Sequence, residues 1–354
     1  MRLRLANQHI AGRLADSPET VVHRLGAVQA QDYLGSLWAV GLRMRSAVEA
    51  AVEQAIADRR MVRTWPMRGT LHFVAADDAR WMLALLAPRV VRSAASRHRQ
   101  LELDAKVFSR AEKILVRALE GGHRLTRPAM YELLNAAGIT TGGSRGLHIV
   151  QQLAHQQLLV FGPREGKQPT FVLLDEWIPS TPSRTREESL AELAVRYFSS
   201  HGPATLHDFG WWSGLTIAET REAVALAGDR VMNDRFGEQM YWLGADTSAF
   251  ADVNDRVYLL PPFDEYTVAY KHRDVIIDPA YTKQVNAGGG MLNAVIVIDG
   301  AVVGTWSRTV KKRDVIVALQ PFKSLRKAET QAIAAAAEMY GAFLGLRAST
   351  ESLR

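Results

Sequence analysis

The order of helical and strand-like segments constrains the fold of this chain more than any other feature. Residues 104–178 begin with three runs in which hydrophobic side chains recur at helical spacing, and two short β-like runs follow. Thr126 stands where a helix N-cap is expected, and glycines separate the helical runs. The expected helices are Val107–Leu119, Arg127–Ala137 and Arg145–Gln157, and the expected strands are Leu158–Phe161 and Thr170–Leu174. Three helices followed by a β-hairpin is the order of a winged helix, whose third helix enters the major groove of DNA.

The same order recurs over residues 186–250, where Thr205 and Thr216 each precede a helical run. We expect helices at Glu188–Ser200, His207–Trp212 and Ile217–Ala227 and strands at Arg230–Asn233 and Gln239–Leu243. Residues 1–103 follow a related order, with helices at Pro18–Ala27, Ala47–Ala57 and Asp77–Leu86 and strands at Met61–Thr64 and Thr70–Phe73. The repetition is one of architecture and not of sequence.

Residues 251–354 differ from the preceding segments because strands dominate them. The expected strands are Val257–Leu260, Val268–Tyr270, Ala294–Ile298 and Val302–Trp306, and the expected terminal helix is Lys327–Leu344. Asp299-Gly300 predicts a tight hairpin between the last two strands, and Pro179–Pro182 predicts a linker. The predicted fold class is α+β, mainly α. It consists of tandem winged helix-turn-helix units at 1–103, 104–178 and 186–250, followed by a β-rich region with a terminal helix at 251–354.

The charge balance favours a polyanionic partner. Lysine and arginine number 43 against 37 aspartates and glutamates, which gives a net charge of +6. Arginine suits phosphates and guanine edges because its guanidinium forms two parallel hydrogen bonds. A winged helix can also serve only to bind proteins, but a basic chain with repeated units favours nucleic acid.

The sequence also excludes several kinds of chemistry. The chain has no cysteine, which rules out disulfides, thiol catalysis and thiolate metal sites. It has no phosphate-binding loop, no nucleophile elbow and no recognisable cluster of histidine and carboxylate metal ligands. We therefore expect no metal and no cofactor. Neither a signal peptide nor a membrane-spanning segment is recognisable, so we expect a cytoplasmic protein that does not bind membranes.

The segment Gln29-Ala30-Gln31 places two amides on either side of a small apolar residue, after the first expected helix. It has two interpretations. It can be simply the polar end of a helix, or, if the chain leaves the helix there, both amides can face one cleft.

Three further clusters contain basic residues, in two cases together with aromatic and turn-forming residues. Arg63–His72 is a strand–turn–strand segment that can bind phosphates and stack on bases, or form an ordinary hairpin with a buried tryptophan. Leu260–Tyr266, followed by Lys271, His272 and Arg273, favours a structural corner over a site. Arg308 and Lys311–Arg313 form a basic run that is either a solvated face or a phosphate clamp.

Taken together, these residues resemble the YcaQ/AlkZ family of bacterial winged-helix DNA glycosylases. The resemblance extends over Leu25–Gly41, Arg63–His72, Leu260–Arg273 and Val297–Trp306, in the family's order. It implies three tandem winged helices around a basic concave surface. It also implies a Gln-Φ-Gln catalytic motif, where Φ is apolar, which Gln29-Ala30-Gln31 matches. The implied activity is hydrolysis of the N-glycosidic bond of N7-alkylated purines, including interstrand crosslinks and bulky natural-product adducts, for alkylation repair or self-resistance.

The resemblance assigns roles to particular residues. Gln29 and Gln31 are the expected catalytic residues, and double-stranded DNA carrying alkylated or crosslinked guanine is the expected partner of a monomeric enzyme. The expected DNA-binding residues are Arg63, Arg68, His72, Arg145, Arg164, Lys167, Lys271, Arg273, Arg308, Lys311, Lys312 and Arg313. The alternative is a winged-helix transcription regulator without catalytic activity.

Overall fold

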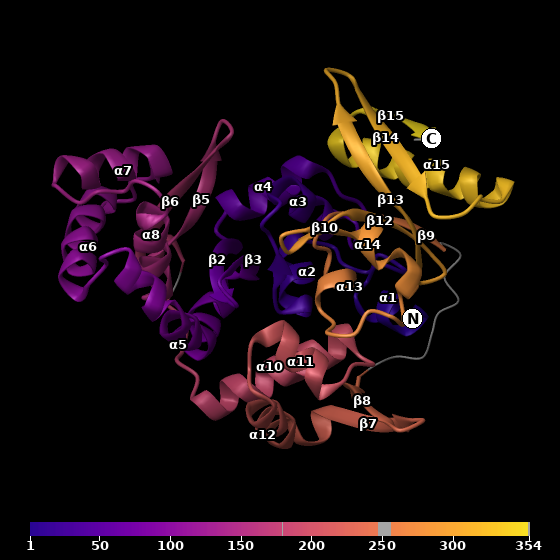
Figure 1. Ribbon diagram of the computed structural model, residues 1–354, viewed down its shortest axis with the longest axis horizontal. Helices are drawn as coiled ribbons and strands as arrows, with labels where there is room; N and C mark the ends of the chain where they lie inside the picture. The colour runs from indigo at the N-terminus through magenta and orange to yellow at the C-terminus, as the bar shows by residue number, and fades with distance from the viewer. Residues whose placement is uncertain (179, 247–255, 353–354) are drawn as a thin grey trace. The chain divides into compact units, whose positions relative to one another are not determined.

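The computed structural model describes residues 1–178, 180–246 and 256–352 and divides the chain into two compact units (Figure 1). The first unit combines Met1–Glu53 with Leu190–Arg354, and the second is Gln54–Ser189. The expected boundaries at 103/104 and 178/186 do not coincide with these limits, and the four-segment division stays a prediction. Positions 250 and 251, where the last two segments meet, and Pro179 of the expected linker lie outside the described residues.

The second unit contains the helices and the hairpin expected for residues 104–178. Its helices are α5 (Ala76–Gln100), α6 (Ala105–Leu119), α7 (Arg127–Ala136), α8 (Arg145–His155) and α9 (Leu174–Trp177), and α4 (Glu49–Ala57) enters it. Its strands, in the order β3-β2-β5-β6-β4, are Thr70–Ala75, Met61–Met67, Leu159–Glu165, Gln168–Leu173 and Leu125–Thr126. Thr126 accepts a hydrogen bond from the backbone of Ala129 and caps α7 as expected. Leu115, Leu153 and Phe171 belong to the core that α6, α7 and α8 form with β5 and β6 (Figure 1).

Helix α5 is longer than the expected helix, Asp77–Leu86, because it continues through Pro88 to Gln100. Proline removes one backbone donor and often ends or kinks a helix, but Pro88 lies within α5. The residues that follow are rich in arginine, which favours helices, and α5 also packs against β2 and α8.

The first unit joins helices from both ends of its sequence. Its helices are α1 (Arg2–Asn7), α2 (Pro18–Leu25), α3 (Tyr33–Gly41), α10 (Arg186–His201, which starts just before the unit), α11 (Leu206–Ser213), α12 (Ile217–Ala227), α13 (Glu265–Val268), α14 (Thr282–Val285) and α15 (Lys327–Leu344). Two 3₁₀ turns, η1 (Gly228–Arg230) and η2 (Pro279–Tyr281), accompany them. Thr205 and Thr216 each form a complete capping box, as their positions predict. The sequence analysis did not predict α3, whose residues Gly35–Gly41 are all buried, so that no polar face marks it as a helix.

A five-stranded sheet of order β15-β14-β13-β12-β9 forms the carboxyl-terminal part of this unit, with α15 packed against it (Figure 1). These strands are Arg347–Ser352, Asp314–Pro321, Ala301–Val310, Ala294–Ile298 and Val257–Leu260. Separate two-stranded ribbons are β7–β8 (Val231–Phe236 and Gln239–Gly244) and β10–β11 (Asn286–Gly288 and Met291–Leu292), and β1 is Val28–Gln29. Asp299 and Gly300 have φ values of 51° and 89° and connect β12 to β13, so the expected tight hairpin is confirmed.

The expected strand Val268–Tyr270 is wrong, because the chain there leaves helix α13 and forms no strand. The Asp264 side chain accepts a hydrogen bond from the backbone of Tyr266 and starts this short helix. Tyr266 and Tyr270 are fully buried, so a run of apolar residues appears that is easily mistaken for a strand.

Helices and strands are thus mixed throughout the chain, and the helix–hairpin order expected for residues 104–178 and 186–250 is present. The assignment of these groups as winged helices stays a prediction. Among the described residues, no helix is both long and apolar enough to cross a membrane.

The second unit is expected to lose stability in acid because of His155. Burial lowers the pKa of His155 from 6.5 to about 4. As the pH falls from 6.5 to about 4, His155 binds a proton in the unfolded chain but not in the folded chain. The unfolding free energy therefore decreases across this window and then levels off. The loss is at most about 3 kcal/mol. His155→Phe should flatten the pH dependence of the unfolding free energy in urea; equal pH dependence in both proteins would contradict this assignment.

Candidate active site

The two glutamines of the Gln-Ala-Gln segment lie between helices and not within one. Helix α2 ends at Leu25, followed by Gly26 with φ 77°, and Gln29 lies in the short strand β1. Asp32 then accepts a hydrogen bond from the backbone of Gly35 and starts α3. The chain therefore leaves the helix before Gln29, which is the condition that the second interpretation of this segment required.

Hydrogen bonds between the two glutamines fix their side chains relative to each other. Gln29 Nε2 donates to Gln31 Oε1 over 2.7 Å, and the backbone nitrogen of Gln31 donates to Gln29 Oε1 over 3.1 Å. Gln29 is 5% exposed, whereas Gln31 lies on the surface. The pair thus extends from the interior of the first unit to its surface. A substrate in solvent can therefore reach the side-chain amide of Gln31.

A buried carboxylate holds the backbone of the inner glutamine. Glu265 is fully buried, and its Oε1 accepts a hydrogen bond from the Gln29 backbone nitrogen over 2.8 Å. Its Oε2 accepts from Trp212 Nε1 over 2.9 Å and lies 3.5 Å from His201 Nε2. Burial lowers the pKa of His201, which favours its neutral form.

The neighbouring acid, Asp264, has a different partner. Both of its oxygens accept hydrogen bonds of 2.8 Å from the guanidinium of Arg43, and both side chains are fully buried. Arg43 also donates to the Ala39 carbonyl and to Gln8 Oε1. This network supports the elements around the glutamine pair but does not contact the pair itself.

One of the expected DNA-binding residues lies beside the glutamine segment. Arg308 is on β13, with Nη2 4.0 Å from Asp32 Oδ1 and Nη1 donating to Tyr340 Oη over 2.7 Å. Burial raises the pKa of Tyr340, so this hydroxyl stays protonated near neutral pH. Arg308 therefore places a positive charge close to the residue that follows Gln31.

The other expected DNA-binding residues of the first unit form two groups. Lys311, Lys312 and Arg313 are exposed at the turn between β13 and β14. Lys271 is exposed just after α13, whereas Arg273 is half-buried and burial lowers its pKa. Only the first group is a continuous exposed run of positive charge.

The second unit holds the remaining expected DNA-binding residues in differing environments. Arg63 is buried on β2 with its guanidinium 4.9 Å from the Phe161 ring, and His72 is buried with Nδ1 3.0 Å from the Thr70 carbonyl. Arg145 begins α8 and donates to the carbonyls of Thr140 and Leu101. Arg68 lies in the β2–β3 turn with φ 55°, and Arg164 and Lys167 lie in the β5–β6 hairpin.

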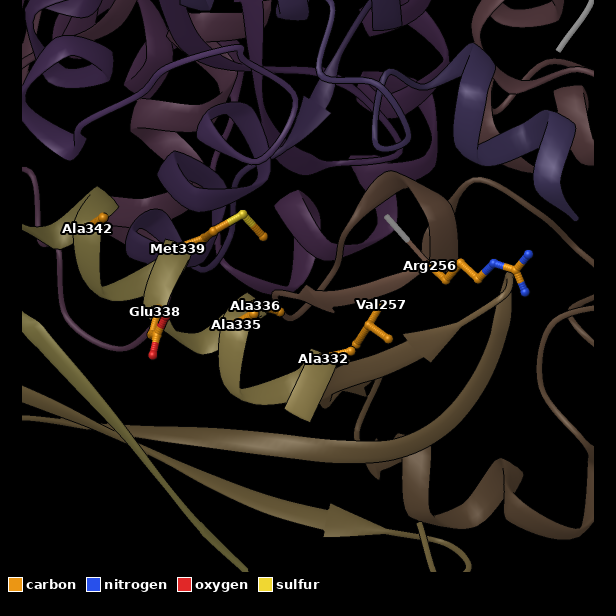
Figure 2. Close-up of a pocket in the computed structure, with 8 residues that line it drawn as sticks. All are labelled: Arg256, Val257, Ala332, Ala335, Ala336, Glu338, Met339 and Ala342. Atoms are coloured by element: carbon orange, nitrogen blue, oxygen red, sulfur yellow. The ribbon is translucent and has the colours of Figure 1, made fainter. Parts of the chain in front are cut away.

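A separate pocket of about 620 Å³ lies between α15 and β9 (Figure 2). Four alanines of α15 line it together with Arg256, Val257, Glu338 and Met339. The glutamine pair is not among its lining residues. Within the part of the chain that the structure describes, no three histidine, aspartate or glutamate side chains are grouped to hold a metal ion.

Sequence reasoning missed the contribution of Glu265, Trp212 and His201 to this site. The sequence favours a structural corner over a site at Leu260–Tyr266. The overlooked signal was a pair of adjacent acids within an apolar and aromatic run, because a carboxylate buried there requires hydrogen-bond donors.

A basic chain with repeated helix–hairpin groups is typical of a protein that binds nucleic acid. Comparison with known proteins gives the family. The chain belongs to the AlkZ-like DNA glycosylases, because the model of this family matches residues 22–343. It is therefore an enzyme that acts on glycosidic bonds of DNA.

Two further comparisons gave matches from Streptomyces sahachiroi, one in sequence and one in structure. A protein described as an interstrand DNA cross-link repair glycosylase is 28% identical over 328 residues, covering 86% of this chain and 85% of its own length. The solved structure of DNA glycosylase AlkZ matches with a TM-score of 0.82 at 23% identity, covering 99% of this chain and 97% of that structure. The second comparison shows a shared fold over nearly the whole chain.

Proposed function

We propose that this enzyme hydrolyses the N-glycosidic bond of N7-alkylated purines in double-stranded DNA, with Gln29 and Gln31 as the catalytic residues. The observation that carries the proposal is the mutual hydrogen bonding of the two amides, one buried and one at the surface. Their orientation is set before substrate binds, as electrostatic stabilisation of a transition state requires.

Neutral amides suit this reaction because the substrate is already activated. Alkylation at N7 puts a positive charge on the purine, so the base can leave without being strongly protonated. The enzyme then has to hold a water molecule near C1′ and tolerate positive charge on the sugar. A glutamine carbonyl can accept a hydrogen bond from that water and direct its dipole toward the developing charge.

The substrate can be a crosslinked or bulky lesion as well as a simple one. The relative in Streptomyces sahachiroi is described as acting on interstrand crosslinks. A crosslinked guanine cannot easily be turned out of the duplex, so the proposed site takes the lesion without base flipping. We also propose that the enzyme is monomeric and that its helix–hairpin groups are tandem winged-helix units. Lys311, Lys312 and Arg313 then contact DNA phosphates. The biological role is alkylation repair or self-resistance to a DNA-alkylating compound.

The direct test incubates the protein with duplex DNA that carries one N7-methylguanine or one guanine–guanine crosslink. Released base and a new abasic site on the damaged strand are expected, with undamaged duplex as the control. The transcription regulator considered from the sequence is not favoured by the family match. DNA binding without release of base from either substrate would overturn the proposed reaction.

The proposed chemistry also predicts that excision needs neither a metal ion nor a lysine nucleophile. Excision should continue in excess EDTA, because amides and water suffice for a cationic leaving group. Borohydride should trap no covalent protein–DNA adduct, because no lysine is assigned to attack the sugar. Loss of excision in EDTA, or a trapped adduct, would show that the amide mechanism is wrong.

A further inference from the structure

We propose that Glu265 is a positioning residue that holds the backbone of Gln29 in its reactive geometry. The inference rests on the proposed function, because it assigns Glu265 a role in the reaction that Gln29 performs. Glu265 is separated from Gln29 by 236 residues in sequence and yet contacts its main chain directly. It does not reach the substrate side of the glutamine pair, since it is fully buried.

The contacts of Glu265 are those of a carboxylate that fixes other groups in place. One oxygen accepts from the Gln29 backbone at 2.8 Å and the other from Trp212 Nε1 at 2.9 Å. Removing a carboxylate from water is costly, and each of these donors offsets part of that cost. The carboxylate is therefore held tightly, and the Gln29 N–H is held with it.

The comparison with Asp264 shows that burial alone does not explain these contacts. Asp264 is the preceding residue and is equally buried, but both of its oxygens accept hydrogen bonds from the Arg43 guanidinium. Glu265 instead faces His201, whose Nε2 lies 3.5 Å away, and directs one oxygen at the glutamine segment. Asp264 thus pairs with an arginine in the core, whereas Glu265 holds the glutamine segment of the candidate site.

The effect on the reaction follows from how Gln29 is held. Its backbone N–H is fixed by Glu265, while its side-chain oxygen accepts from the Gln31 backbone and its Nε2 donates to Gln31 Oε1. Without the first contact, rotation about the Gln29 backbone would move both amides together. A small misplacement of the groups that orient a water molecule slows the reaction strongly while leaving DNA binding largely intact.

The test replaces Glu265 with leucine, which removes both acceptors, and with glutamine, which keeps one. Glu265→Leu should lower single-turnover excision of N7-methylguanine at least about tenfold and change the Kd for DNA less than about threefold. Glu265→Gln should lie between Glu265→Leu and the wild type. Tyr266→Phe is the matched control, since it removes only the neighbouring buried hydroxyl, which donates to the Gly300 carbonyl.

Amide hydrogen exchange supplies a measurement that does not depend on activity. The Gln29 amide should exchange faster in Glu265→Leu and Glu265→Gln than in Tyr266→Phe, with the β12 amides as an internal reference for general loosening. If Glu265→Leu does not fold, the excision rate and the Gln29 amide exchange of Glu265→Gln test the inference. Excision and Gln29 exchange equal to those of Tyr266→Phe would overturn the inference. A wild-type protein that excises nothing would overturn the proposed function instead, and Gln29 exchange would still show whether Glu265 holds this segment.

Discussion

Alanine in place of Gln29 or Gln31 is expected to lower single-turnover excision at least about tenfold, a loss of roughly 1.4 kcal/mol or more in transition-state stabilisation. Each amide is hydrogen-bonded to the other residue, so either replacement also frees the remaining side chain to rotate. The double variant should therefore lose less than the sum of the two single losses, because the pair acts as a unit. The measurement is the rate of base release from N7-methylguanine duplex with enzyme in excess.

The affinity of both variants for DNA should change little, because neutral amides contribute little to phosphate binding. Gln320→Ala is the control, since it removes an exposed glutamine on β14, in the sheet of the same unit. Wild-type rates in both alanine variants, with the wild type active, would remove these glutamines from the mechanism.

Replacing Asp264 with alanine is expected to cost about 3–5 kcal/mol of unfolding free energy. The change leaves the Arg43 guanidinium fully buried without its carboxylate partner, and it also removes the acceptor for the Tyr266 backbone at the start of α13. The measurement is denaturation in urea at neutral pH. The variant Arg43→Met/Asp264→Leu should recover part of the loss, because no unpaired charge remains in the core.

Asp314→Ala provides the comparison for this second result. Asp314 forms an ion pair with Arg347 at 3.2 Å, but the side chain of Arg347 is 81% exposed and that of Asp314 is 45% exposed. Exposed pairs contribute only about 0–1 kcal/mol, so this variant should stay close to the wild type. An equal, small effect of Asp264→Ala and Asp314→Ala would mean that the Arg43–Asp264 pair does not stabilise the fold as its burial indicates.

Several elements whose cause lies within a few residues were predicted well. The helix Lys327–Leu344 and the strand Ala294–Ile298 have the expected bounds, and Thr205 and Thr216 cap the helices that they precede. A cap is a hydrogen bond between a side chain and a backbone group two or three residues away, so the sequence alone contains it. The family could likewise be recognised from short segments in order, and the matching family model confirms it.

Predictions failed where distant segments decide the structure. The residues Val268–Tyr270 have an apolar pattern that fits a strand, but Val268 ends helix α13 and the buried Ala269 and Tyr270 follow it. Strand β14 was not predicted, and neither was β15, which pairs with it in parallel across a long connection. Parallel strands are joined by a long connection, so the residues of a strand do not by themselves indicate that it pairs in this way.

Some features of the candidate site are likewise contained in the sequence, whereas others depend on how distant segments pack. The sequence by itself determined that two amides flank an alanine at or after the end of a helix, and that basic residues are frequent in the chain. Only the tertiary structure decided that Gln29 is buried while Gln31 is exposed, that Arg63 and His72 are buried, and that Arg308 lies near Asp32. The physical reason is that burial and hydrogen bonds between distant residues, such as that from Gln29 to Glu265, arise from packing the whole unit.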